Sequence, residues 1–576
     1  MEKTSFVELK KNAKKDMEDL KECRVAILGN CSTQHLATAL KGFGYKENYN
    51  LNIFDSDYNQ IDSQIMDDES ELYKHNPEFV LIYMATEKLY EQFCDMNLES
   101  RAEFADLILQ KISNYWETLN SKIKTNIIQF NFIEIDDRIF GNYANKTPNS
   151  FIYQLRKLNF NLMELSANTK NAFIVDLSTI QNCYGREKIY DDKLYYIAKM
   201  PLSTNILPEI AKQVIDVIKT LHGKLKKCVI LDLDNTLWGG VIGDDGLKSI
   251  QIGELGLGHA FSEFQMWLKE LKNRGILLAI CSKNNEDTAK EPFEKHPEMV
   301  LRLDDISMFV ANWENKASNI KNIQATLNIG MDSMVFIDDN PFERNLVRGM
   351  IPDITVPELP EDPALYLSYL KSLNLFETAS YSENDKDRTK QYQAQAQRVT
   401  LQNSFENFEE YLKSLEMVAT VHEFEDFEIP RISQLTQRSN QFNLRTIRYT
   451  EAEIEEICKD DKYITLSFSL KDKFGDYGLI SVIIMEKMDE KTLFLNTWLM
   501  SCRVLKRGME EFIINKVIET AKEKRFEKVI GEYIKTPKNS MVENIYSKLG
   551  FTDLGDGKFE TIVSRFENNK TCIVMA

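Results

Sequence analysis

Short apolar runs alternate with helical patterns in the first part of this 576-residue chain. The runs are typical of buried strands and are VAIL (25–28), LNIF (51–54), FVLIY (79–83), NIIQF (126–130) and AFIVD (172–176). Strands separated by helix-length segments run parallel, because each return of the chain passes through a helix. The sequence therefore predicts a parallel sheet covered by helices over residues 1–224.

A second series of strand-like runs predicts another α/β domain over residues 225–375. Its runs are KKCVILDLD (226–234), ILLAICS (276–282), MFVA (308–311), SMVFIDD (333–339) and DITVPEL (353–359). Residues 376–416 are polar and lack glycine and proline, which indicates a helical connector. Strands and helices mix again over 417–576, so we expect an α/β multidomain protein with a carboxyl-terminal α+β domain.

Composition excludes several classes of protein. The formal net charge is −18 with no basic stripe, which argues against a nucleic-acid binder. No apolar run is long enough to cross a bilayer and the first residues are charged, so we expect no membrane partner and a cytoplasmic location. Nine scattered cysteines without paired spacing favour reduced thiols over disulfides.

Reactive side chains stand where three strands of the second series are predicted to end. Asp232 and Asp234 follow the first strand, Ser282 closes the second, and Asp338 and Asp339 follow the last. The carboxyl ends of parallel strands form one edge of a sheet, where ligands commonly bind. Four carboxylates at one edge would repel each other unless a cation lay between them, and oxygen ligands suit Mg²⁺.

These segments resemble the four-motif signature of the haloacid-dehalogenase (HAD) superfamily of phosphotransferases. Its first motif, DxDxT, is Asp232-Leu233-Asp234-Asn235-Thr236, and its second is Ser282. The third motif is a lysine, for which we choose Lys316 over the nearby Lys283 and Lys321, and the fourth is the pair Asp338-Asp339. The resemblance implies a Rossmann-like HAD domain and an Mg²⁺ cofactor.

The same resemblance implies a role for each residue. Asp232 attacks phosphorus, and Asp234 protonates the leaving oxygen and then activates water. Ser282 and Lys316 hold the phosphoryl oxygens. We also expect metal ligands and substrate-binding residues at this site. The expected metal ligands are Asp232, Asp234, Asp338 and Asp339, although Asp339 could instead lie next to a ligand. The expected substrate-binding residues are Thr236 and Asn284.

The segment VAILGNCSTQHLATALKG (25–42) reads as a strand, a tight turn and a helix, with Cys31 at the turn. A helix that began at Cys31 would lower the pKa of the thiol and place His35 on the same face. The segment resembles the GDS block of SGNH-type hydrolases, with Asn30 and Cys31 in place of Asp and Ser. The prediction is an SGNH-like acyl-transfer domain with Cys31 and His35 as catalytic residues, and the alternative is that Cys31 is a packed core residue.

Longer blocks resemble the FkbH-like proteins, the HAD subclass of polyketide and nonribosomal peptide pathways. They are LDLDNTLWGGVIGDDG, SKNN, FIDDNPFER, QRSNQFNLRT (437–446), DKFGDYGLIS (472–481) and MSCRVLKRGME (500–510). The resemblance implies a glyceryl transferase/phosphatase that uses D-1,3-bisphosphoglycerate and loads a D-glyceryl group onto the phosphopantetheine thiol of an acyl carrier protein. The alternatives are an Mg²⁺-dependent phosphatase of a small metabolite and a scaffold that recruits carriers.

The last domain resembles the GNAT acyltransferases. The segment RVLKRGMEEFI (503–513) stands where that family has its pyrophosphate loop, but Lys506 occupies the first glycine position. We therefore expect either a degenerate domain that receives the pantetheine arm of the carrier or a purely structural domain.

Overall fold

The five apolar runs of the amino-terminal part form one parallel sheet, as predicted. The computed structural model describes residues 4–381, 388–402, 405 and 407–576 and divides the chain into two compact units, Met1–Lys219 and Thr220–Ala576. The strands of the first unit are β1 (Lys21–Gly29), β2 (Tyr49–Asp55), β3 (Phe79–Tyr83), β4 (Asn126–Phe130) and β5 (Ala172–Val175), in the order β2-β1-β3-β4-β5.

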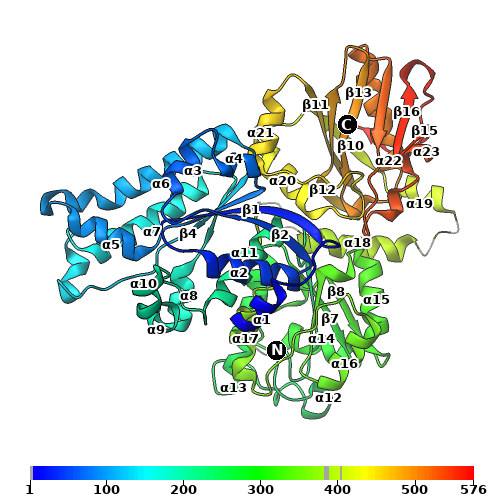
Figure 1. The fold of residues 1–576 in the computed structure, drawn as a ribbon. Coiled ribbons are helices and arrows are strands. Elements are labelled where there is room, and N and C mark those ends of the chain that lie inside the picture. The colour runs from blue at the N-terminus through cyan, green and yellow to red at the C-terminus, as the bar shows by residue number, and fades with distance from the viewer. Residues whose placement is uncertain (1–3, 382–387, 403–404, 406) are drawn as a thin grey trace. The chain divides into compact units, whose positions relative to one another are not determined.

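Helices cover this sheet on both faces (Figure 1). They are α1 (Phe6–Asn12), α2 (Gln34–Lys46), α3 (Ile61–Met66), α4 (Glu71–His75), α5 (Thr86–Asp95), α6 (Phe104–Lys122), α7 (Phe151–Ala167), α8 (Leu177–Tyr184), α9 (Arg186–Ile189) and α10 (Asp192–Ala198), and α11 (Leu207–Leu221) leads out of the unit. One continuous core joins β1, β3 and β4 to α6 and α7. The apolar runs lack alternation because both faces of the sheet are buried.

The second unit contains a four-stranded parallel sheet in the order β8-β7-β6-β9. Its strands are β6 (Cys228–Leu231), β7 (Leu277–Ser282), β8 (Met308–Ala311) and β9 (Met334–Ile337). Its helices are α12 (Ile242–Asp245), α13 (Leu257–Asn273), α14 (Glu286–Lys295), α15 (Lys316–Leu327), α16 (Pro341–Met350) and α17 (Tyr366–Ser372). Two separate apolar clusters lie on its two faces.

The run at 353–359 is not a strand, which corrects the prediction. A single parallel bridge joins Thr355 to Val335. Pro357 has no N–H group to donate to a ladder, so the segment is unsuited to extended pairing.

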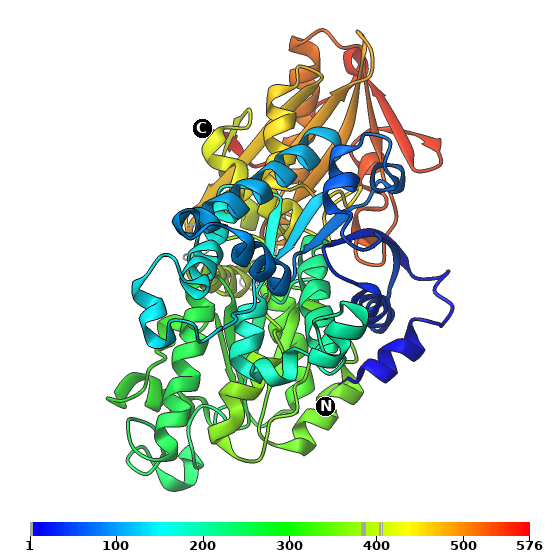
Figure 2. The same ribbon diagram turned by 60° about the vertical axis from the view of Figure 1, so that its left-hand side comes forward.

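The remainder of the second unit contains an eight-stranded sheet in the order β15-β16-β14-β13-β12-β11-β10-β17. Figure 2 shows strands of this sheet in orange. Its strands are β10 (Val418–His422), β11 (Tyr463–Asp472), β12 (Gly475–Lys487), β13 (Thr492–Met500), β14 (Lys528–Glu532), β15 (Thr552–Gly555), β16 (Lys558–Ile562) and β17 (Val574–Met575). Helices α20 (Ile429–Arg438), α21 (Glu451–Lys459), α22 (Met509–Glu523) and α23 (Ile545–Lys548) accompany it. Most neighbouring strands are antiparallel, while β13 runs parallel to β14 and β10 runs parallel to β17.

The predicted connector contains two helices, α18 (Arg388–Gln402) and α19 (Phe408–Ser414). Residues 382–387, 403–404 and 406 of the connector lie outside the described part of the chain. Tyr392 of α18 packs in the core of the four-stranded sheet. Arg398 of the same helix forms an ion pair with Asp472 at 2.7 Å, so α18 contacts both sheets of the second unit.

Candidate active site

Three strands of the four-stranded sheet bring the predicted site residues to one edge. Asp232 follows β6, Ser282 ends β7, and Asp338 and Asp339 follow β9. Strand β6 lies between β7 and β9, and all three run parallel, so their carboxyl ends are neighbours. The topology therefore brings Asp232 and Asp338 to the same edge of the sheet, although they are about a hundred residues apart in the sequence.

A cluster of three carboxylates with one lysine forms the centre of this edge. Oxygen atoms of Asp232, Asp338 and Asp339 all lie within 4.8 Å of one another. The Nζ atom of Lys316, the first residue of α15, lies 2.9 Å from Asp232 and 2.6 Å from Asp338. The side chains of Lys316 and Asp338 are only 4% and 0% exposed, so their charges interact with little solvent screening.

The charges of this cluster do not balance. Burial and the charge of Asp232 raise the pKa of Asp338, and the same two causes raise the pKa of Asp339. Burial alone would lower the pKa of Lys316, but Asp232 and Asp338 outweigh it and raise the pKa. Three carboxylates against one ammonium group leave negative charge for a cation, and a set of buried carboxylate oxygens suits a hard divalent ion.

Asp234 does not join the three-carboxylate group. Its Oδ1 atom accepts hydrogen bonds from Trp238 Nε1 at 2.9 Å and from the backbone N–H of Ile242 at 3.0 Å. Its Oδ2 atom accepts a longer bond, 3.3 Å, from Asn284 Nδ2. Burial raises the pKa of Asp234, although the bonds from Ile242 and Trp238 oppose the rise. The structure thus places the carboxyl of Asp234 outside the three-carboxylate group, and its predicted roles in proton transfer and metal binding stay predictions.

Polar contacts behind the cluster fix its orientation. The Oγ1 atom of Thr236 accepts a bond from the N–H of Asp339 at 3.1 Å and donates to Asp339 Oδ1 at 3.4 Å. Thr236 is fully buried and these two bonds hold it against Asp339, while its role in substrate binding stays a prediction. Asn284, the other predicted substrate-binding residue, donates to Asp234.

Arg344 is a positioning residue that the sequence did not reveal. It lies on α16, is 5% exposed, and donates to the carbonyl oxygens of Asp338 at 2.9 Å and Asp339 at 2.5 Å. Glu358 pairs with the same guanidinium at 2.9 Å. Arg344 is the last residue of the block FIDDNPFER, and this position was the only indication of its role in the sequence. Trp238 lies in the block LDLDNTLWGG, which was the corresponding indication for that residue.

The other candidate lysines are placed elsewhere. Lys283 pairs with Glu343 at 2.6 Å, and Lys321 is exposed on α15. Lys316 is therefore the lysine that meets the carboxylates. Ser282 is 2% exposed at the end of β7, on the strand that adjoins β6.

The structure corrects the expectation of an activated thiol at Cys31. Helix α2 begins at Gln34, three residues after Cys31, and the thiol is 1% exposed. Burial is the main cause that raises the pKa of Cys31, and the charges of Glu87 and Asp55 add to it. The ring of His35 stacks on Phe6 at 5.3 Å, and among the described residues no hydrogen bond joins His35 to Cys31. Burial and Lys10 lower the pKa of His35.

The predicted loop of the last domain is a tight turn before α22. Lys506 has a φ of 60° and Gly508 a φ of 81°, and Gly508 directly precedes the helix. The N–H of Lys506 donates to Glu510 Oε1 at 3.1 Å. A lysine thus holds a left-handed conformation at this turn, where glycine is the usual residue.

Membrane-spanning helices were not found: in the part of the chain that the structure describes, no helix has both the length and the apolar character that crossing a bilayer requires.

Comparison with known proteins identifies a family and a solved structure that is similar to a large part of this chain. Residues 24–219 match the model of the family described as FkbH, N-terminal domain. The chain is 52% identical to the N-terminal part of BF1531 from Bacteroides fragilis, which contains a phosphatase domain and is complexed with Mg; the match covers 66% of this chain and 100% of that chain, with a TM-score of 0.63. No curated protein matches the chain.

Two weaker structural likenesses are to acetyltransferases. The ribosomal-protein-S18-alanine N-acetyltransferase from Escherichia coli is 14% identical, with 26% of this chain and 98% of that chain covered and a TM-score of 0.21. The spermidine N-acetyltransferase from Vibrio cholerae in complex with CoA and spermine is also 14% identical, with 26% and 96% covered and a TM-score of 0.21. Scores this low support no conclusion about fold or function, and the SGNH-like and GNAT-like assignments stay predictions.

Proposed function

Since this chain belongs to the FkbH family, we propose that it is an Mg²⁺-dependent phosphatase that also loads a D-glyceryl group onto an acyl carrier protein. The phosphatase proposal rests on one observation: Lys316 forms ion pairs with Asp232 and Asp338 at the carboxyl ends of β6 and β9. The phosphatase domain of the Bacteroides fragilis relative, which is complexed with Mg, supports the choice of metal.

The donor set fits a magnesium ion. Asp232, Asp338 and Asp339 would hold it, because they supply hard oxygen atoms within 4.8 Å of one another. Among the described residues, the single ammonium group of Lys316 balances only part of their negative charge. When bound, Mg²⁺ offsets the negative charge of the phosphoryl oxygens in the transition state.

The protein's own residues then perform two transfers. A carboxylate oxygen of Asp232 attacks phosphorus and the bond to the leaving oxygen breaks, which leaves an aspartyl phosphate. Asp234 gives the leaving oxygen its proton from Oδ2, since Oδ1 is occupied by Trp238 and Ile242. Asp234 then takes a proton from the water that attacks the aspartyl phosphate and releases phosphate. Lys316 stays paired with Asp232 and stabilises charge on the transferred oxygens.

The acyl phosphate of D-1,3-bisphosphoglycerate supplies the chemistry for the second activity. A thiolate attacks the acyl carbonyl, the C–O bond to phosphate breaks, and a thioester forms, while the stable 3-phosphate ester is removed at Asp232. The acyl group reaches the phosphopantetheine thiol either through Cys31 or directly. The burial and raised pKa of Cys31 favour the direct route.

Intact-mass measurement of a holo-carrier tests this proposal. The carrier is incubated with the protein, Mg²⁺ and D-1,3-bisphosphoglycerate, and we expect a mass gain of one glyceryl group. The Asp232→Asn variant should instead load phosphoglyceryl or nothing, and Cys31→Ala separates the relay from direct attack. Phosphate release without any change in carrier mass would establish the alternative, an Mg²⁺-dependent phosphatase of a small metabolite.

A further inference from the structure

Lys283 stands beside the carboxylate cluster and has no part in the proposed mechanism. It directly follows Ser282, the last residue of β7, and its Nζ atom lies 2.6 Å from Oε1 of Glu343, in the first turn of α16. Strands β7 and β9 flank β6, and neighbouring strands lie about 4.8 Å apart. The ion pair therefore joins the segments that follow the two neighbours of β6, the strand that leads to Asp232.

The two ends of this ion pair differ in their access to solvent. The side chain of Glu343 is 7% exposed, whereas that of Lys283 is 35% exposed. Lys316 and Arg344 lie at the same edge of the sheet, but their side chains are only 4% and 6% exposed. Of these three cations, Lys283 is the one that a substrate arriving from solvent can reach.

The ammonium group of Lys283 keeps hydrogen-bonding capacity for a ligand. Such a group has three N–H donors, and Glu343 accepts from one of them. Within the described part of the chain, the other two donors have no protein partner. A ligand can therefore bind Lys283 while the ion pair with Glu343 stays intact.

Glu343 holds this ammonium group in place. Its Oε2 atom is buried and has no hydrogen-bond partner among the described residues, so the bond of Oε1 to Lys283 stabilises its charge. Release of Lys283 would leave a buried carboxylate without a cation, which is costly. The lysine is thus ordered before a substrate binds, and this lowers the entropy that binding costs.

The residue that follows Lys283 contacts the predicted acid. Asn284 donates to Oδ2 of Asp234, the oxygen from which the proposed mechanism protonates the leaving oxygen. Lys283 and Asn284 are consecutive, so their Cα atoms are about 3.8 Å apart. The leaving part of a substrate therefore lies close to Lys283.

The centre of the site has no excess positive charge for a second anionic group. Three carboxylates, those of Asp232, Asp338 and Asp339, face the single ammonium group of Lys316. A divalent cation brings this group to neutrality, and the bound phosphoryl group then adds negative charge of its own. A further anionic group on the substrate consequently needs a cation outside the cluster.

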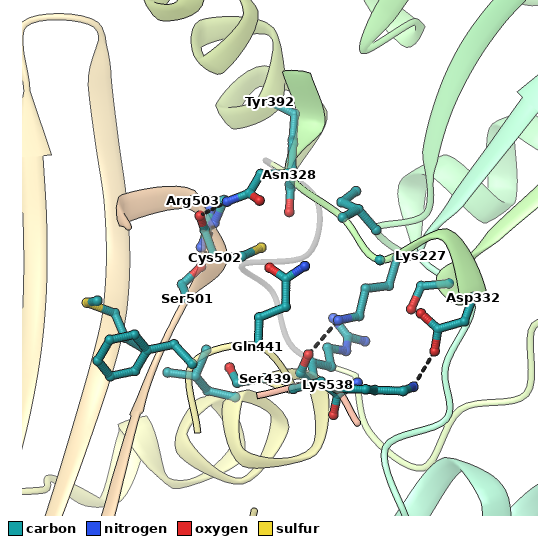
Figure 3. A pocket seen from close by; sticks show the side chains of 18 of the residues that line it. Lys227, Asn328, Asp332, Tyr392, Ser439, Gln441, Ser501, Cys502, Arg503 and Lys538 are labelled. Atoms are coloured by element: carbon teal, nitrogen blue, oxygen red, sulfur yellow. Dashed lines mark hydrogen bonds and ion pairs between the residues drawn. The ribbon is translucent and has the colours of Figure 1, made fainter. Parts of the chain in front are cut away.

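A cavity at the other edge of the same sheet does not supply that cation. Figure 3 shows Lys227 and Asp332 in the lining of this cavity, whose volume is about 260 Å³. These two residues precede β6 and β9, whereas Asp232 follows β6, and each of the two strands has four residues and spans roughly 13 Å. A small substrate bound at Asp232 does not reach the cavity.

We propose that Lys283 is a specificity-determining residue that binds a second anionic group on the leaving part of the substrate. The site thereby selects phosphate esters of hydroxy acids, and of their acyl phosphates, over phosphate esters of neutral alcohols. Ammonium groups bind carboxylate and phosphate oxygens through charge-assisted hydrogen bonds, which are roughly twice as strong as neutral ones. The proposal rests on the phosphatase function proposed for the carboxylate cluster.

Two stable phosphate esters test this selectivity in the full-length protein with Mg²⁺. D-3-Phosphoglycerate carries a carboxylate on its leaving group, whereas glycerol 3-phosphate has the same ester on a neutral three-carbon alcohol. Phosphate release is measured for each ester, and the readout is the ratio of the two kcat/KM values. We expect the parent protein to favour D-3-phosphoglycerate by about 10–100-fold, which is the effect of one hydrogen bond to a charged group.

Replacement of Lys283 should remove this preference. In Lys283→Met the ratio should fall close to one, through KM rather than kcat, because a contact to a distant group is equally strong in the bound substrate and in the transition state. Lys283→Arg keeps the charge and should keep most of the preference. Lys295→Met is the matched control, because it removes an exposed lysine that pairs with Glu291 on α14, and it should keep the ratio of the parent protein.

A variant with both Lys283→Met and Glu343→Gln removes the two charges together, so no buried carboxylate is left without a cation. It should lose the preference as Lys283→Met does, and it decides the question if the single variant does not fold. A double variant that keeps the preference of the parent protein would overturn the proposal, since repulsion by Glu343 would then explain the single variant. Equal kcat/KM values for the two esters in the parent protein would overturn it as well.

Failure of the phosphatase function gives a different result. If the parent protein releases no phosphate from either ester or from D-1,3-bisphosphoglycerate in Mg²⁺, the phosphatase function and the role of Lys283 are both refuted. If the parent protein releases phosphate but the ratio is the same in Lys283→Met and Lys295→Met, the role of Lys283 alone is refuted.

Discussion

Replacing Lys316 by methionine removes the ammonium group that, in the described part of the chain, forms the ion pairs with the three-carboxylate group, and it nearly preserves side-chain volume. At 2.9 and 2.6 Å, each ion pair contributes roughly 6 kcal/mol with an effective dielectric constant of about 20, and the cost of burying the ammonium group offsets much of this. Removal of one partner from a buried ion pair typically costs about 3–5 kcal/mol. We expect a loss near the lower end of that range, about 3 kcal/mol, because Asp338 can take up a proton.

Chemical denaturation in EDTA and in Mg²⁺ measures this effect. The free energy of unfolding of Lys316→Met should fall by about 3 kcal/mol in EDTA and by less in Mg²⁺, since the metal supplies the missing positive charge. Lys321→Met is the matched control, because it makes the same change at an exposed position of α15 and should alter stability by no more than about 0.5 kcal/mol. Equal stability of the two variants in EDTA would refute the argument from charge balance.

Three further changes test the site. Arg344→Met removes the donor to the carbonyls of Asp338 and Asp339 and should weaken Mg²⁺ binding by about 10–100-fold, measured as the Mg²⁺ concentration for half-maximal phosphate release; unchanged Mg²⁺ dependence would contradict its positioning role. Asp232→Asn should reduce phosphate release by orders of magnitude, and near-normal release would mean that the nucleophile lies elsewhere. Cys31→Ala should retain Mg²⁺-dependent phosphate release and, by the direct route, also carrier loading, while loss of loading together with a hydroxylamine-labile adduct in the parent protein would establish the thiol relay.

The strands were predictable because buried central strands read as continuous apolar runs. All five runs of the first unit and four runs of the second became strands, and parallel pairing followed from the helical patterns between them. The strand prediction at 353–359 was wrong. The segment is apolar enough for a strand, but it contains Pro357, and in the structure Thr355 makes only a single bridge.

The position of Asp234 could not be predicted from its spacing to Asp232. Residues two apart lie on the same side of the chain only within a strand, but β6 ends at Leu231 and Asn235 has a φ of 55°. The carboxyl of Asp234 consequently turns to Trp238 and Ile242 instead of to the carboxylate group.

The environment of Cys31 depends on contacts that local sequence does not encode. The side chain of Asn30 accepts from the N–H of Ala85 at 2.7 Å, and the N–H of Ser32 donates to the carbonyl of Lys199 at 3.0 Å. These long-range bonds fix the turn that precedes α2, and the thiol is buried there.

Phosphate release with and without a chelator tests the central claim most directly. The account predicts that EDTA abolishes phosphate release from D-1,3-bisphosphoglycerate by this protein, once spontaneous hydrolysis is subtracted, and that added Mg²⁺ restores it, because Asp232, Asp338 and Asp339 leave negative charge that a cation must offset. The same Mg²⁺ addition should leave Asp232→Asn inactive. Release that continues unchanged in EDTA would contradict a metal-dependent phosphatase site at this edge of the sheet.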